Sequence, residues 1–183
     1  MGIGIIGLGI VAFYSIVVYN QLIRRKMLIE EAYAGIDVQL QLRYDLVPML
    51  VEVVKATRLH ESSTLKEVIE LRSRGMSGTL SVEALGKNEV ALSRALARLM
   101  VNVENYPELR ANQNFSELQT QLVDIEDLLG EARRYYNATV RYFNIYKQQF
   151  PNVLIANLFR FSDGTYFAVS EDNARKSPGV SLS

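Results

Sequence analysis

The chain has 183 residues, enough for one domain with a hydrophobic core plus an anchor or a tail. Lys and Arg total 20 and Asp and Glu total 20, so no overall positive field favours nucleic acid or an acidic substrate. The sequence has no cysteine, which excludes disulfides, thiolate catalysis and cysteine-ligated metal sites.

The first predicted element is an apolar helix over residues 1–23, a stretch without a charged side chain. At about 1.5 Å per residue this stretch spans roughly 30 Å, the thickness of the hydrocarbon core of a bilayer. A cleaved signal peptide would carry basic residues before the apolar run and small residues at its cleavage site. Here the basic residues Arg24, Arg25 and Lys26 come after the run. We therefore favour an uncleaved transmembrane anchor over a signal peptide.

The basic cluster also predicts orientation. Lys and Arg that flank a span are retained on the cytoplasmic side of the membrane. We expect a single-pass protein with its N-terminus outside and a cytoplasmic domain over residues 24–161. Membrane lipid is then the first expected partner.

Three long helical patterns follow the anchor, and no stretch shows sustained strand alternation, so the predicted class is all-α. The first pattern runs from the basic cluster to about Arg74, where Gly75 supplies a stop. No helix breaker separates this pattern from the span, so the two can form one continuous rod. The turn-rich segment 75–81 then leads to a second helix over residues 82–105. The apolar seam of this second helix comprises Leu85, Leu92, Leu96, Leu99 and Val103.

A loop over residues 105–115 precedes the third helix. Ser116 and Gln119 form a capping box that is predicted to begin this helix, which then reaches Phe150 and ends at Pro151. Its apolar seam comprises Leu118, Leu122, Ile125, Leu129, Ala132, Tyr136, Phe143 and Phe150.

The remaining chain is predicted to complete the domain. A short apolar segment, residues 153–159, packs one end of the bundle as a short fourth helix. Residues 162–183 form a polar tail that frays. The expected architecture is a transmembrane helix leading into an antiparallel bundle of three long helices and a short fourth.

The stretch "IDVQLQLRYDLVPMLVEVVK", residues 36–55, carries two apolar stripes about 120° apart when placed on a helix. One stripe comprises Ile36, Leu40, Val47, Leu50 and Val54, and the other Val38, Leu42, Leu46, Met49, Val53 and Ala56. A helix with two apolar stripes needs two partners, within the chain or in a neighbouring copy. Pro48 falls on the polar side, where a proline is expected to bend the helix around its partners.

Gln39 and Arg43 fall between the two stripes, where a buried polar group needs a hydrogen-bond partner. The third helix offers a polar row along one edge of its seam, formed by Glu126, Arg133, Asn137 and Asn144. We expect a structural polar layer in which Arg43 meets Glu126, and Gln39 meets Asn137 or Arg133. Such a layer would raise the free energy of bundles in which the helices are wrongly aligned. The alternative is that the row lies in solvent.

These stretches resemble the LemA family of bacterial membrane proteins. The resemblance is carried by residues 36–55, by His60 and Glu61, by "YPELRANQNFSELQTQL" (106–122) and by "ARRYYNATVRYFNIYKQQFP" (132–151). It implies a bundle of long antiparallel helices anchored in the bacterial inner membrane, with the soluble domain in the cytoplasm and no established enzymatic activity. Family members are encountered beside membrane-bound zinc metalloproteases, and one branch belongs to magnetosome membrane assembly.

Catalytic chemistry is not expected from these residues. His60 is the only histidine, whereas a helical metalloprotease site needs two histidines one turn apart. We predict no catalytic, metal-binding or cofactor-binding residue, and no nucleic-acid partner because a clustered basic groove is missing.

Two functions remain. In the first, the protein is a non-enzymatic scaffold whose copies self-associate through the bundle and organise the membrane surface. In the second, it is an adaptor for a membrane-bound enzyme such as a zinc metalloprotease. Tyr135 and Tyr142 point away from the third seam, where tyrosine can serve a protein interface.

Overall fold

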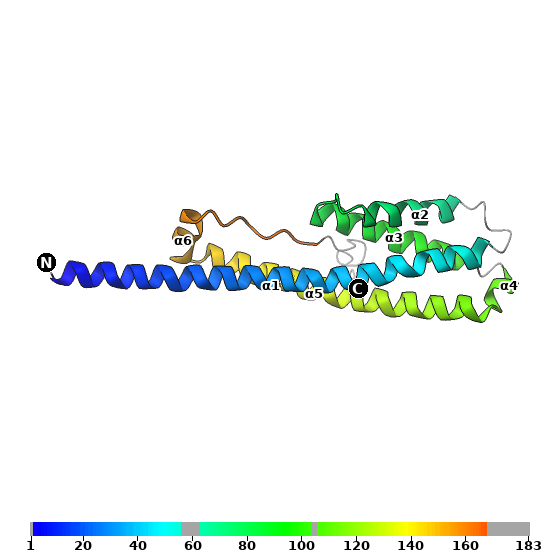
Figure 1. The fold of residues 1–183 in the computed structure, drawn as a ribbon, viewed down its shortest axis with the longest axis horizontal. Coiled ribbons are helices and arrows are strands. Elements are labelled where there is room, and N and C mark those ends of the chain that lie inside the picture. Colours follow the sequence, from blue (N-terminus) through cyan, green and yellow to red (C-terminus); the bar gives the residue numbers. More distant parts are fainter. Residues whose placement is uncertain (1, 56–62, 104–105, 168–183) are drawn as a thin grey trace, which may run out of the picture.

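A computed structural model describes residues 2–55, 63–103 and 106–167, and within these ranges the chain is helical with no strand. Helix α1 extends from Gly2 to Lys55, a single helix of 54 residues. In Figure 1 its N-terminal end projects beyond the rest of the molecule as a rod. The all-α prediction is confirmed, and so is the continuity of the apolar stretch with the first bundle helix as far as Lys55.

Helix α2, Ser63–Met76, lies beside α1 instead of extending it. The Arg72 Nε donates a hydrogen bond of 2.6 Å to the carbonyl oxygen of Tyr44. Twenty-eight residues of uninterrupted helix would separate these two residues by about 42 Å. The prediction of one helix reaching Arg74 is therefore wrong. The connection between the two helices lies in residues 56–62, outside the described residues, as do His60 and Glu61.

Folding α2 back has a physical reason, because it buries Leu65 and Val68 in the same core as α1. Gly75 does not stop the helix, since α2 continues through it to Met76. The predicted turn follows directly and leads to helix α3, Val82–Val103. Residues 104 and 105, the predicted end of this helix, lie outside the described residues.

Helix α5 extends from Gln113 to Gln148, after a four-residue helix α4, Pro107–Arg110, within the predicted loop. The predicted capping box is wrong. The Asn112 Oδ1 accepts a hydrogen bond of 3.2 Å from the Phe115 amide, so the helix begins before Ser116. Asn112 supplies the same capping chemistry one turn earlier. Helix α6, Asn152–Leu158, is the expected short helix at one end of the bundle.

The helices form an elongated bundle in which α1 and α5 lie side by side along most of their length (Figure 1). Helices α2 and α3 pack on each other at the end near α4, whereas α6 lies at the opposite end. The first stripe of α1 is buried in the core that these helices share, as predicted: Ile36, Leu40, Val47, Leu50 and Val54. Phe150, in contrast, is 82% exposed because α5 has already ended at Gln148.

The segment 162–167 lies extended along α5, so the expectation that it frays is wrong for these residues. Asn144 and Gly164 exchange two hydrogen bonds between side-chain amide and backbone, of 2.8 and 3.0 Å. Asn137 and Phe167 exchange two more, of 2.9 and 3.1 Å. Seven residues of helix rise about 10.5 Å, and three extended residues span about 10 Å. The spacing of the two asparagines therefore matches the spacing of the two backbone sites.

Candidate functional site

The most polar part of the interior lies where α1, α2, α3 and α5 meet, around Arg43. This guanidinium is 3% exposed. Its Nη2 lies 2.8 Å from Glu126 Oε2 and donates to Ser93 Oγ at 2.9 Å, and its Nη1 lies 3.4 Å from Glu89 Oε2. The structure thus places Arg43 against Glu126, the partner expected from the sequence, and adds two partners from α3.

Glu89 is absent from the predicted layer although it is fully buried. Its carboxylate accepts hydrogen bonds from the Tyr44 hydroxyl and from Asn88 Nδ2, in addition to the ion pair with Arg43. A signal for it exists in the sequence. Position 89 lies four residues after Leu85 and three before Leu92, which completes the alternating spacing of the α3 seam. A carboxylate at a seam position predicts a buried charge that needs a partner.

Tyr44 connects this carboxylate to α2. Burial raises the pKa of the Tyr44 hydroxyl, and its hydrogen bond to Glu89 raises the pKa further, so the group stays a neutral donor. Gly75 of α2 lies directly against it, and a Cβ added at residue 75 would lie 2.7 Å from Tyr44 Cζ. Tyr44 belongs to neither apolar stripe of α1 and is nevertheless buried, because α2 covers that side of the helix.

The second basic group, Arg133 of α5, lies at the edge of this cluster. Its Nη1 is 3.6 Å from Glu126 Oε1, and its guanidinium lies 5.5 Å from the centre of the Phe167 ring. Burial lowers the pKa of Arg133, and the charge of Glu126 opposes that shift. The two arginines, Arg43 and Arg133, face the two carboxylates Glu89 and Glu126. The cluster is thus balanced in charge.

Three residues of the expected layer are placed differently. Gln39 is half-buried, and its Oε1 has no hydrogen-bond partner in the described part of the chain. The expected pairing of Gln39 with Asn137 or Arg133 is wrong for that oxygen, because the Asn137 amide is used by the backbone of Phe167, and Arg133 Nε and Nη2 likewise have no partner among the described residues. Asn144 likewise binds Gly164. The polar row on α5 therefore divides into a charged part that meets α1 and α3 and an amide part that holds the chain after α6.

Pro48 lies inside α1 with an exposed side chain, on the side predicted for it, and the bend that it would produce stays a prediction. In the basic cluster, Arg24 and Lys26 are exposed. The Arg25 guanidinium lies 4.3 Å from the centre of the Tyr146 ring, which connects the part of α1 just after the apolar stretch to α5.

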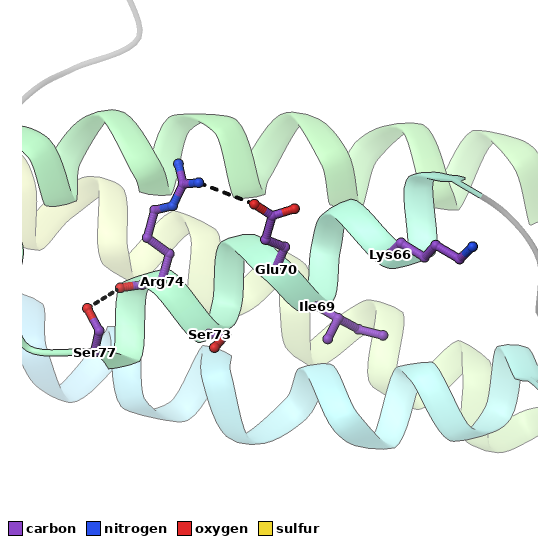
Figure 2. Close-up of a pocket in the computed structure, with 6 residues that line it drawn as sticks. All are labelled: Lys66, Ile69, Glu70, Ser73, Arg74 and Ser77. Carbon is purple, nitrogen blue, oxygen red and sulfur yellow. Dashed lines mark hydrogen bonds and ion pairs between the residues drawn. The ribbon is translucent and has the colours of Figure 1, made fainter.

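Both carboxylates of the cluster bind groups of the chain itself, with Glu89 fully buried and Glu126 partly exposed. A surface hollow lies elsewhere, along α2, and Figure 2 shows it. All of its lining residues come from α2 and the turn after it, and Arg74 is paired with Glu70 at 3.2 Å. Among the residues drawn in Figure 2, none comes from a second helix, so no polar group faces this hollow from across it. Neither place resembles a catalytic centre in the described part of the chain.

The comparison with known families agrees with this architecture. The LemA family matches residues 32–182, which is most of the chain. The chain belongs to the LemA family. The matched region begins within α1 and includes every residue of the buried cluster. The apolar part of α1 precedes it.

Curated relatives of this LemA protein match over a shorter region. Two magnetosome proteins of Paramagnetospirillum magneticum, MamQ 1 and MamQ 2, are 34% identical to it over 73 residues, and MamQ of Magnetospirillum gryphiswaldense is 33% identical. The aligned region covers 40% of this chain and 27% of each relative, so the chain spans about a quarter of their length. Helix α1 also contains a stretch that is long and apolar enough to cross a membrane. Family, relatives and α1 together indicate a membrane-associated protein.

Proposed function

We propose that this LemA protein is a non-enzymatic scaffold, anchored in the bacterial inner membrane by residues 1–23, whose copies self-associate through α1. The N-terminus lies outside and the bundle lies in the cytoplasm, because Arg24, Arg25 and Lys26 follow the apolar stretch. The buried cluster around Arg43 keeps the helices of the bundle in their correct alignment.

Packing of the apolar stretch supports an anchor that is retained. Val18 and Leu22 are buried against Phe143 of α5 and Ala156 of α6. The Tyr14 hydroxyl donates a hydrogen bond of 2.8 Å to Asn152 Oδ1. Cleavage after the apolar stretch would remove these contacts and expose the end of the bundle. These contacts support a retained anchor over a signal peptide.

The observation that carries self-association is the second apolar stripe of α1. Val38, Leu42 and Met49 are 56%, 47% and 52% exposed, whereas every described residue of the first stripe is buried. Leu46 and Val53 of the same stripe are half-buried. An aligned row of exposed apolar side chains on a rigid helix favours association with another surface. A second copy presents the same row at the same height above the membrane, so two α1 helices can pair along it.

Mass measurement on the full-length protein in detergent micelles or nanodiscs tests this proposal. We expect a defined multiple of the 20.7 kDa chain. Val38→Glu places a charge in the stripe and should shift the protein toward the monomer. The matched control is Val101→Glu, since Val101 of α3 is 61% exposed and lies outside the stripe. This control should leave the assembly unchanged.

Two results would contradict the scaffold. One is a wild-type monomer at concentrations near those in the membrane, and the other is an assembly that Val38→Glu leaves intact. A monomer that co-purifies with a membrane-bound enzyme, such as a zinc metalloprotease, would favour the adaptor function instead.

A further inference from the structure

A second apolar surface lies at the opposite end of the bundle from α4, on and beside α6 (Figure 1). It is formed by Phe150, Leu154, Leu158 and Phe159, which are 82%, 59%, 72% and 51% exposed. We call these four residues the apolar foot. Leu154 and Leu158 lie one turn apart on one face of α6, and Asn152 and Ala156, buried against the rest of the protein, lie on the opposite face. Leu154 and Leu158 therefore point away from the bundle.

The contacts of α6 fix its position along α1. Tyr14 binds Asn152, Val18 and Leu22 pack in one cluster with Ala156, and the Tyr19 ring lies 4.7 Å from that of Phe159. All of these α1 residues precede Arg24, the first charged residue of the helix. Counted back from Arg24 at about 1.5 Å per residue, Leu22 lies roughly 3 Å and Tyr14 roughly 15 Å along the helix.

These heights correspond to one leaflet. The hydrocarbon core is about 30 Å thick, so one leaflet contributes about 15 Å of it. If Arg24 marks the headgroup boundary, the stretch of α1 that α6 covers lies in the leaflet next to the bundle. A soluble helix docked at that height would expose a polar outer face, whereas α6 exposes Leu154 and Leu158, with Phe150 and Phe159 exposed on either side of it. Exposed basic residues, Arg24 and Lys26, follow this stretch on α1, as anionic headgroups would favour.

We infer that the apolar foot is a membrane-binding surface that inserts into the leaflet next to the bundle. The foot binds lipid, because it is continuous with the apolar surface of α1 and lies beside the part of α1 that precedes Arg24. Interfacial helices likewise bury an apolar face among lipids, to a depth of about 5–10 Å. The protein is then held by two contacts, the α1 span and the foot. Together they restrict rotation of the bundle about the axis of α1. This inference rests on the membrane anchor of the proposed function and goes beyond it in assigning lipid to α6.

Depth-dependent quenching tests the inference on the full-length chain. The sequence contains no cysteine, so one introduced cysteine carries a fluorescent label at one position. Leu154→Cys and Leu158→Cys report on the foot, Ile10→Cys on the span, and Val101→Cys on an exposed apolar position near the other end of the bundle. The proteins are reconstituted into liposomes of phosphatidylcholine and phosphatidylglycerol, part of which carries a nitroxide close to the headgroup. The measurement is repeated in nanodiscs that each hold one protein, so that no second copy can cover the foot.

We expect several-fold stronger quenching at Leu154→Cys and Leu158→Cys than at Val101→Cys, in liposomes and in single-copy nanodiscs alike. Quenching at Ile10→Cys with none at the foot would overturn the inference and leave the anchor standing. No quenching at any of the three positions would overturn both. Labels at the foot that are shielded from water but not quenched by lipid would show that a protein covers α6, which also contradicts the inference.

Discussion

Tyr44 of α1 occupies the space that a side chain at Gly75 of α2 would fill. Tyr44 donates its hydroxyl hydrogen to Glu89 of α3, and its carbonyl oxygen accepts from Arg72 of α2. The absence of a side chain at residue 75 thus lets α2 approach α1 at the height of the charged cluster. This close approach determines the position of α2 along the bundle.

The contact predicts that Gly75→Ala destabilises the fold, although alanine is the better helix former. Overpacking against the Tyr44 ring should cost about 1–3 kcal/mol in the free energy of unfolding. The matched control is Gly130→Ala in α5, where the nearest atom to an added Cβ is 3.6 Å away. That substitution should stabilise the protein by about 0.5–1 kcal/mol. Denaturation of the detergent-solubilised protein, followed by circular dichroism, measures both, and equal effects of the two substitutions would contradict the close approach.

Removing Arg43 should leave Glu89 buried without its ion-pair partner. We expect Arg43→Met to lower the free energy of unfolding by about 3–5 kcal/mol. The double substitution Arg43→Met with Glu89→Met removes both charges and should recover part of this loss, because the uncompensated buried charge is gone although the Tyr44 hydroxyl loses its acceptor. A double-mutant cycle on melting curves checks this.

Arg43→Met also tests whether the polar layer determines helix alignment. If this single substitution preserves the melting temperature and the oligomeric state, the alignment role is wrong.

Asn137 and Asn144 of α5 hold residues 162–167, so removing one of these asparagines should let the segment open locally. Asn144→Ala removes both hydrogen bonds to Gly164, and loss of partners for a backbone group costs about 1–3 kcal/mol. We expect faster hydrogen exchange in a peptide that covers this segment, with little change in α3. Asn114→Ala, at an exposed position near the start of α5, is the control and should leave exchange in the segment unchanged. Unchanged exchange in Asn144→Ala would contradict the contact.

The same segment should loosen in acid. The Lys147 ammonium donates to Asp163 at 2.5 Å, and this hydrogen bond, together with the positive charge, holds the pKa of Asp163 below its ordinary value of 3.8. Because the pKa is lowered in the folded state, the contact stabilises the segment at any pH above the ordinary pKa of the carboxyl group. This stabilisation is lost as the pH falls through the lowered pKa. The amide hydrogen-exchange rate of residues 162–167, corrected for the intrinsic effect of pH on exchange, should therefore increase as the pH is lowered through this range.

The control for the acid effect is Asp163→Asn, which removes the titrating group. This variant should show weaker protection of residues 162–167 at neutral pH and a smaller change on acidification. An identical pH profile in the two proteins would assign the loosening to other carboxylates.

Much of the fold follows from the spacing of apolar residues. Ile36, Leu40, Val47, Leu50 and Val54 recur at helical spacing, and burial of one continuous face is the only way in which such a helix removes them from water. The seam of α5 is predictable for the same reason, and Val140 and Lys147 occupy further buried positions along that helix. In the charged cluster, the pairing of Arg43 with Glu126 could be anticipated because both side chains border the seams of helices that pack together.

The fold-back between α1 and α2 could not be anticipated in the same way. Neither glycine nor proline occurs between Pro48 and Gly75, so local propensity favours one continuous helix. Burial of Leu65 and Val68 against α1 and α3 outweighs that preference, and this gain exists only when distant helices are already side by side. The segment 162–167 is a similar case, because its polar residues predict a tail, and among the described residues its backbone finds partners only in side chains of α5, the amides of Asn137 and Asn144 and the hydroxyl of Tyr136.

The sequence by itself determined that this protein is helical, that an uncharged stretch continues into the first bundle helix, and that this helix carries two apolar stripes. These features depend on residues close together in the chain, where periodicity and charge act directly. Only the tertiary structure decided which stripe is covered, that Glu89 joins Arg43, and that α6 lies beside Tyr14 and Leu22 with its leucines facing outward. Those outcomes depend on how distant helices align, and alignment is set by the summed packing of the whole bundle.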